Sequence, residues 1–307
     1  MESRHPLLRI QTNRLFLFLL LLLPIFCMMP SSVQADVGID GNPLLSGTVV
    51  LNRYARVSTI SGNTITVENI ADLNDGGAGH FANESLSPGD LILIYQAQGA
   101  SFTNSNNDAD YGSFAYQNAG HYEFAIVASV SAIDNQITID ASNTPPYACS
   151  GLSNTYSPVN GRLQVVRVPQ YTSLTIDNGT TVTAVPWNGT RGGIVALHVQ
   201  YDLIVNGAID ASGMGFRGGD PANAPASPPV RGITSFRTST SRNGGEKGES
   251  ILGDWAVYDL NNGRYARGAP ANGGGGGNAH NAGGGGGANG TNGSGAWIYG
   301  QGFVAPD

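Results

Sequence analysis

The chain has 307 residues, 44 of them glycine, and only 12% of its residues are charged, a composition that argues against an ordinary helical protein. Its net charge of −7 and its single lysine, Lys247, leave no basic patch. Binding to the phosphates of nucleic acids is therefore excluded, and an anionic lipid surface is a poor partner.

The first 35 residues have the three-part layout of a secretory signal peptide. Three arginines make the start of the chain positive, and residues 15–29 form an apolar run. Small residues stand at the −3 and −1 positions of a cleavage site that ends in Ala35. We therefore predict cleavage between Ala35 and Asp36 and an extracellular or cell-surface location.

Two other readings of this segment are weaker. A membrane anchor needs about 20 apolar residues, whereas this run is shorter and is interrupted by Pro24. A lipoprotein would use Cys27, but the bulky Phe26 precedes it where a small residue is expected. Cleavage would leave 12 basic and 21 acidic side chains, with Cys149 as the one remaining cysteine. No internal disulfide is then available, and no later segment is long enough to span a membrane.

Between Gly47 and Asp210, short runs rich in β-branched and aromatic residues alternate with turn residues, which predicts an all-β architecture. The runs are 48–51, 64–67, 90–95, 122–130, 136–139, 163–168, 173–176 and 194–199. We assign residues 36–170 to a β-sandwich-like domain. Two of its segments are similar, V-S-T-I at 57–60 with I-T-V at 65–67 and V-S-A-I at 130–133 with I-T-I at 137–139. Convergence of β-hairpins on this composition is the favoured explanation, and duplication is the alternative.

Residues 171–219 have a different pattern. Within them, three short runs at 194–199, 202–207 and 208–213 follow one another with small corner residues and almost no connecting residues. This spacing is typical of a parallel β-helix, in which each coil needs the next one to bury its inner face. We predict a short right-handed parallel β-helix-like segment; an ordinary meander is the alternative.

Residues 220–307 form a Pro/Ser/Gly-rich low-complexity region. Two runs of five glycines lie at 273–277 and 283–287. The region is either a flexible loop or tail, or a tightly packed glycine insertion held by flanking strands. Trp297, Ile298 and Tyr299 are apolar enough to form a short terminal β segment.

One stretch offers candidate metal ligands. Asn104, Asn106, Asp108 and Asp110 alternate, so their oxygens would converge on one side of an extended loop, as Ca²⁺ requires. The match to an EF-hand loop is poor, and a solvated surface loop is the alternative. The oxygen-rich loop from Asp72 to Asn83 has the same ambiguity. No other cofactor is indicated.

Six tyrosines in the first β region, with Trp187 later, could form a sugar-binding face, because their rings stack on sugars. The six are Tyr95, Tyr111, Tyr116, Tyr122, Tyr147 and Tyr156. Half-buried strand positions would explain most of them without any ligand.

The runs at 89–100, 165–197 and 203–219, the last leading into polyglycine, resemble the N-terminal region of large exported, glycine-rich bacterial surface proteins of the adhesin and β-solenoid type. The segment V-N-G-A-I-D-A-S-G-M-G at 205–215 carries the resemblance most clearly. It implies a structural or adhesive role at the cell surface and supplies no catalytic residues.

We found no catalytic motif, so the first hypothesis is a secreted or cell-surface structural protein of the adhesin type without catalytic activity. Surface glycans or other cell-surface proteins are its expected partners. A secreted carbohydrate-binding module, dependent on calcium or not, is the second hypothesis. A polysaccharide lyase or hydrolase built on a β-helix is the third.

Overall fold

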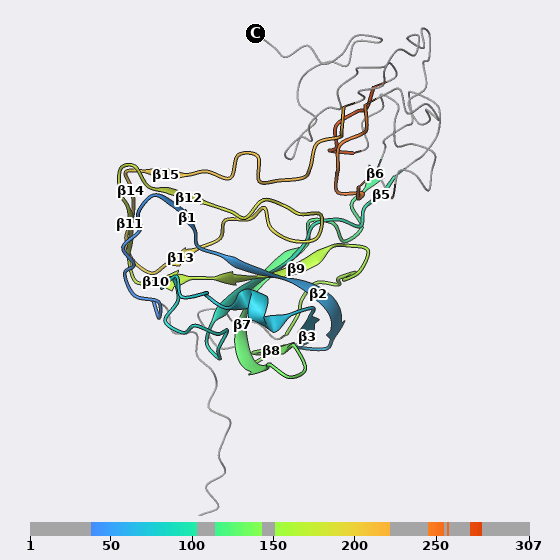
Figure 1. Cartoon of the computed structure of the whole chain (residues 1–307). Coiled ribbons are helices and arrows are strands. Elements are labelled where there is room, and N and C mark those ends of the chain that lie inside the picture. The colour runs from blue at the N-terminus through green and yellow to red at the C-terminus, as the bar shows by residue number, and fades with distance from the viewer. Residues whose placement is uncertain are drawn as a thin grey trace, which may run out of the picture. The chain divides into compact units, whose positions relative to one another are not determined.

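The computed structural model describes residues 38–102, 114–142, 151–221, 245–254, 257 and 271–277 (Figure 1). In these residues, strands and one 3-10 helix, η1 (Ile70–Leu73), form an all-β fold, as predicted. No helix in the described part of the chain is long and apolar enough to cross a membrane.

Six antiparallel strands form a closed barrel. Around the barrel they follow the order β2 (Arg53–Ser61), β3 (Thr64–Val67), β8 (Gln136–Ile139), β7 (Tyr122–Ser131), β4 (Leu91–Gln96) and β9 (Leu163–Val168). Strand β9 closes the circle because it pairs with β4 on one side and with β2 on the other.

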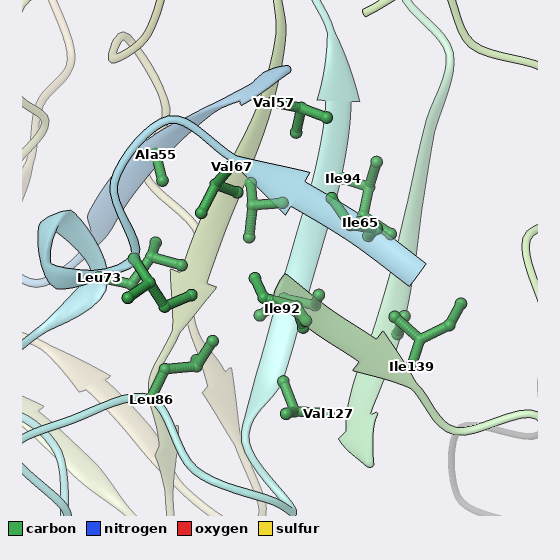
Figure 2. Packing of buried hydrophobic residues seen from close by; sticks show 14 of the residues in the cluster. Ala55, Val57, Ile65, Val67, Leu73, Leu86, Ile92, Ile94, Val127 and Ile139 are labelled. Carbon is green, nitrogen blue, oxygen red and sulfur yellow. The ribbon is translucent and has the colours of Figure 1, made fainter. Parts of the chain in front are cut away.

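The barrel interior is filled by the apolar residues that alternate along its strands, since successive side chains of a strand point to opposite faces. Figure 2 shows part of this cluster, in which Ile65, Ile92 and Ile94 meet Leu73 and Leu86 from the segment between β3 and β4. The interior residues are almost entirely shielded from solvent.

The closed barrel corrects the β-sandwich-like domain predicted for residues 36–170. A sandwich and a barrel have the same alternation of apolar and polar residues, so strand patterns alone do not separate them. The difference lies in the pairing of β9 with β2, which joins residues more than a hundred positions apart.

The two similar hairpins occupy matching places in the barrel. The β2–β3 pair changes register between Val57 and Thr59, and the β7–β8 pair changes register between Val127 and Ser129. Strands β3 and β8 then pair with each other, with Ile65 opposite Ile137. The shared bulge position and the symmetric pairing favour duplication more than the sequence did, and they align Val57 with Val127 rather than with Val130.

Outside the barrel, short strands pair in parallel with strands that lie 27 to 29 residues further along the chain. Strand β10 (Gln170–Tyr171) pairs with β13 (His198–Val199), and β11 (Leu174–Ile176) pairs with β14 (Leu203–Val205). Strand β12 (Thr181–Thr183) lies between β1 (Thr48–Val50) and β15 (Ala208–Ile209). The chain thus passes the same three positions repeatedly. We name the passes layer 1 (38–50), layer 2 (170–197) and layer 3 (198–216).

The barrel lies between layer 1 and layer 2 in the sequence. Residues 38–50, which the sequence analysis places with the domain before residue 170, are bonded to layer 2 instead. The backbone N–H groups of Thr172 and Thr181 donate to the carbonyl oxygens of Gly41 and Gly47. The barrel is therefore an insertion within the stacked layers.

In the described glycine-rich segments, the backbone hydrogen bonds between neighbouring segments recur every three residues. The N–H groups of Glu246 and Glu249 donate to the carbonyls of Asp220 and Arg217, at 2.8 and 2.9 Å. Residues 245–248 pair in the same way with 274–277. Three residues per turn is the repeat of a polyproline II helix rather than of a strand. A short hairpin of β5 (Ser101–Phe102) and β6 (Phe114–Ala115) completes the described strands.

Candidate functional site

Three polar side chains, from β2, β9 and the residue before β2, form hydrogen bonds to the backbone of residues 192–196. Asn52 donates to the carbonyl of Ala196 at 2.7 Å and accepts from its N–H at 2.9 Å. Gln164 bonds the N–H and carbonyl of Gly192 in the same two-way manner, and the Tyr54 hydroxyl donates to the carbonyl of Ile194 at 2.6 Å. Because this segment lies outside any sheet, these side chains satisfy backbone groups that a strand would otherwise pair.

An apolar groove of about 410 Å³ lies beside this junction. The barrel contributes Leu93, Tyr122 and Phe124, and layer 3 contributes Leu203 and Ile209, with residues 194–197 between them. On the barrel side, Tyr122 pairs in register with Tyr95, and Phe124 pairs with Leu93. The lining contains one titratable side chain, Tyr122, and no carboxylate or amine.

The groove opens onto the inner face of layer 3. In layer 2, Leu174, Ile176 and Val182 are at most 1% exposed. Their register partners in layer 3, Leu203, Val205 and Ile209, are 43, 46 and 44% exposed. The apolar column that runs through the layers is thus covered at layer 2 and open at layer 3. Among the described residues, β13, β14 and β15 each have one hydrogen-bonded neighbour.

A buried charge network closes one end of the barrel. Arg167 is on the interior face of β9, and its guanidinium contacts the Asp90 carboxylate at 2.8 Å. It also donates to the carbonyl oxygens of four residues in the segment between β3 and β4, and it lies 4.0 Å from the centroid of the Phe81 ring. The four acceptors are Leu73, Asn83, Glu84 and Ser85. Arg167 therefore holds this segment over the barrel.

Burial controls the ionisation of this network. It raises the pKa of Asp90 to about 6, although the neighbouring Arg167 opposes the rise. Burial also raises the pKa of Asp40, which accepts from the N–H groups of Ala82 and Gln170 at 2.7 Å. The network joins layer 1, layer 2 and the barrel, and its contacts are internal. We therefore assign it to stability rather than to binding.

A second polar contact anchors the glycine-rich segment. Glu249 is buried, and its carboxylate accepts from Gln98 at 2.8 Å and from the Arg217 Nε at 2.9 Å. Lys247 is also buried, and burial lowers its pKa to about 7. A Cβ atom at Gly219 would overlap the carbonyl of Glu246, so the chains approach as closely as they do only because this residue is glycine. These contacts pack the described glycine-rich residues closely together, whereas most of residues 220–307 lie outside the part of the chain that the structure describes, so both predicted alternatives for the region stay open.

The predicted calcium ligands Asn104, Asn106, Asp108 and Asp110 lie outside the described residues, as do Ala35 and Asp36 of the predicted cleavage site. The described residues contain no cluster of three or more His, Cys, Asp or Glu side chains that could hold a metal ion.

In the loop from Asp72 to Asn83 the acidic groups have internal partners. Asp75 pairs with Arg53 at 2.7 Å, and Asp72 pairs with Arg191. The Glu84 carboxylate, just beyond the loop, accepts from the backbone of Gly76 and Gly77.

The predicted aromatic face divides into separate places. Tyr122 lines the groove and pairs in register with Tyr95, whereas the Tyr156 hydroxyl donates to Glu123 at 2.7 Å. Tyr116 is exposed and meets Phe114 edge to face. Tyr111 and Tyr147 lie outside the described residues. No sequence pattern indicated that Phe124 and Leu203 would line one groove with Tyr122, because that depends on how layer 3 meets the barrel.

Comparisons with known proteins add little. No protein-family model matches the chain, and no curated protein matches it. A comparison with solved structures finds the crystal structure of the tailspike protein gp49 from Pseudomonas phage LKA1, at 16% identity and a TM-score of 0.20. The match covers 44% of this chain and 21% of the tailspike. A likeness of this size carries no argument about fold or function.

Proposed function

We propose that this chain is an exported, cell-surface structural protein of the adhesin type, with no catalytic activity of its own. In this proposal the layers are the first coils of a right-handed parallel β-helix, and the inserted barrel supports them from the side. One observation carries it: parallel strands recur in constant register around one apolar column, with Val49, Val182 and Ile209 on successive layers. A repeating stack of this kind is a scaffold, because each layer is stabilised mainly by its neighbours.

The chemistry of the described surfaces supports a scaffold over a catalyst. The groove is lined by aliphatic and aromatic groups, whereas a polysaccharide lyase or hydrolase would need carboxylates or other acid–base groups there. The buried ionisable groups Asp90, Arg167 and Lys247 are engaged in the interior. Sugar recognition, the other alternative, needs several polar groups beside the aromatic rings, and among the side chains that line the groove the Tyr122 hydroxyl is the one polar group.

Export is tested first, by producing the full chain with its own leader in a bacterial host. We expect a mature N-terminus at Asp36 and the protein in the extracellular or surface fraction. Ala35→Phe places a bulky group at the −1 position and should block processing, whereas Gln34→Phe at the −2 position is the matched control and should be processed. An unprocessed wild-type chain in the cytoplasm would overturn the proposal.

Binding and catalysis are then measured on the processed protein. A glycan array, with and without a calcium chelator, and turnover of anionic and neutral polysaccharides separate the three hypotheses. The scaffold proposal predicts no turnover. Calcium-dependent glycan binding would move the assignment to the second hypothesis, and release of oligosaccharides would move it to the third.

A further inference from the structure

The corner between β11 and β12 exposes an asparagine that is followed by glycine (Figure 1). A hydrogen bond of 3.0 Å from the Thr180 N–H to the Asp177 carbonyl closes this turn. Gly179 has a φ of +84°, as the third position of a type II turn requires. Within the described part of the chain, neither the Asn178 side chain nor the Gly179 N–H has a hydrogen-bond partner, and a Cβ atom at Gly179 would meet nothing within 4 Å.

An exposed Asn-Gly pair of this kind undergoes an intramolecular reaction. The Gly179 backbone nitrogen gives up its proton to solvent base and bonds to the side-chain carbonyl carbon of Asn178, and ammonia leaves. The product is a five-membered succinimide. Water then adds to one of the two ring carbonyls and breaks the adjacent C–N bond, which leaves isoaspartate or aspartate. Glycine favours the attack because no Cβ atom hinders the approach.

Two other Asn-Gly pairs of the described chain have their glycine nitrogens engaged. These pairs begin at Asn160 and Asn206. The N–H of Gly161 donates to the Ser157 carbonyl at 2.7 Å, and the N–H of Gly207 donates to the Ile176 carbonyl at 2.8 Å. A nitrogen that shares its proton with a carbonyl is held in place and loses that proton only after the hydrogen bond opens. These pairs are therefore protected.

The pairs that begin at Asn188 and Asn272 are restrained at the side chain instead. The Asn188 Oδ1 accepts from the N–H groups of Thr190 and Arg191, at 2.9 and 3.0 Å. The Asn272 Oδ1 accepts from the N–H of Ile251 at 2.9 Å. Each side-chain amide must leave these donors before its carbon can turn toward the next backbone nitrogen. Asn178 differs from these pairs because both of its reacting groups are free.

We infer that Asn178 is a site of spontaneous deamidation and isoaspartate formation in the folded chain, and that the reaction loosens layer 3 from layer 2. The Thr180 carbonyl accepts from the Ala208 N–H of β15 at 2.9 Å. Gly207 packs so closely on the carbonyls of Asp177 and Thr180 that a Cβ atom would overlap them. Isoaspartate adds a methylene to the main chain of this corner and a second carboxylate beside Asp177, so it displaces the surface on which layer 3 packs. The inference holds whether or not the chain is a surface scaffold.

Incubation of the purified full chain at mildly alkaline pH, in native buffer and in urea, tests the site. Peptide mass spectrometry locates deamidation, and enzymatic methyl transfer from S-adenosylmethionine detects isoaspartate. In the native chain we expect Asn178 to react at least about tenfold faster than Asn160 and Asn206, because bonded amides react only after local opening. In urea the rates should converge. Equally fast native reaction at any of the other described pairs, or no reaction at Asn178 in either state, would overturn the inference.

Two variants separate the site from its surroundings. Asn178→Gln keeps an exposed amide, but its ring would have six members and closes far more slowly, so isoaspartate at this position should disappear. Asn206→Gln is the matched control and should leave the reaction at Asn178 unchanged. After incubation, hydrogen exchange of the peptide that contains Ala208 should be faster in the wild-type chain and unchanged in Asn178→Gln. Unchanged exchange in a chain that carries the isoaspartate would overturn the loosening of layer 3.

Discussion

Replacement of Arg167 by leucine tests whether the buried charge network holds the barrel closed. The substitution removes the ion pair with Asp90 and the bonds to four carbonyl oxygens, and it leaves the Asp90 carboxylate buried without its cation. Removal of one partner of a buried pair costs about 3–5 kcal/mol. In a domain of this size that corresponds to a fall in Tm of roughly 6–20 °C.

The measurement is urea and thermal unfolding of the purified full chain, followed by circular dichroism. Arg56→Leu is the matched control, because Arg56 pairs with Glu68 on the barrel surface, where an ion pair contributes about 0.2–1 kcal/mol. Adding Asp90→Asn to Arg167→Leu removes the stranded charge and should restore part of the loss. A change in Tm for Arg167→Leu no larger than that of Arg56→Leu would refute the reasoning.

Four further predictions follow from the described contacts. Gly207→Ala should destabilise the chain by about 2 kcal/mol or more, because its Cβ overlaps two carbonyls, whereas Gly215→Ala, with open space around it, should be nearly neutral; equal urea midpoints would contradict this. Leu174→Ala should cost about 2–5 kcal/mol in urea unfolding, and a cost under 1 kcal/mol would mean that the column is not packed. The pKa of Asp90 is higher in the folded chain than in the unfolded chain, so the contribution of this residue to stability is greatest below pH 4 and is lost as the pH rises through about 6. Asp90→Asn should therefore flatten this part of the plot of urea midpoint against pH, and an unchanged slope would contradict the prediction. An amine-reactive ester should modify the N-terminus quickly but the buried Lys247 only after urea is added, as peptide mass spectrometry would show, and rapid native labelling of Lys247 would contradict its burial.

Local patterns in the sequence predicted the barrel strands β3, β4, β7, β8 and β9. The run predicted at 194–199 was wrong over residues 194–197, since only β13 at its end is a strand and the residues before it bond to side chains of the barrel instead. The run Leu163–Val168 is rich in β-branched residues, and β9 has those bounds. The glycines at 179 and 207 mark corners, as the spacing of the short runs indicated. These features are local, so they depend on residues that are close in the sequence.

The remaining features depend on contacts between distant residues. Strand β1 pairs with β12 more than a hundred residues later, and the same separation joins β2 to β9. From the sequence alone, Arg167 would be expected to be an exposed charge on a strand. Its burial is favourable because it donates to carbonyl groups of the segment between β3 and β4, and no sequence motif marks that segment. The groove forms where the barrel, residues 194–197 and layer 3 come together. These parts are distant in the sequence, so no local pattern predicts the groove.

Amide hydrogen exchange of residues 170–183 tests the stacked layers most directly. Layer 2 has backbone bonds to layer 1 on one side and to layer 3 on the other. Its amides should therefore exchange as slowly as those of the barrel strands β4 and β9. Asn52→Ala removes the two hydrogen bonds to Ala196, so it should speed exchange in the layers more than in the barrel. Exchange of residues 170–183 at the rate of an open loop would contradict the account.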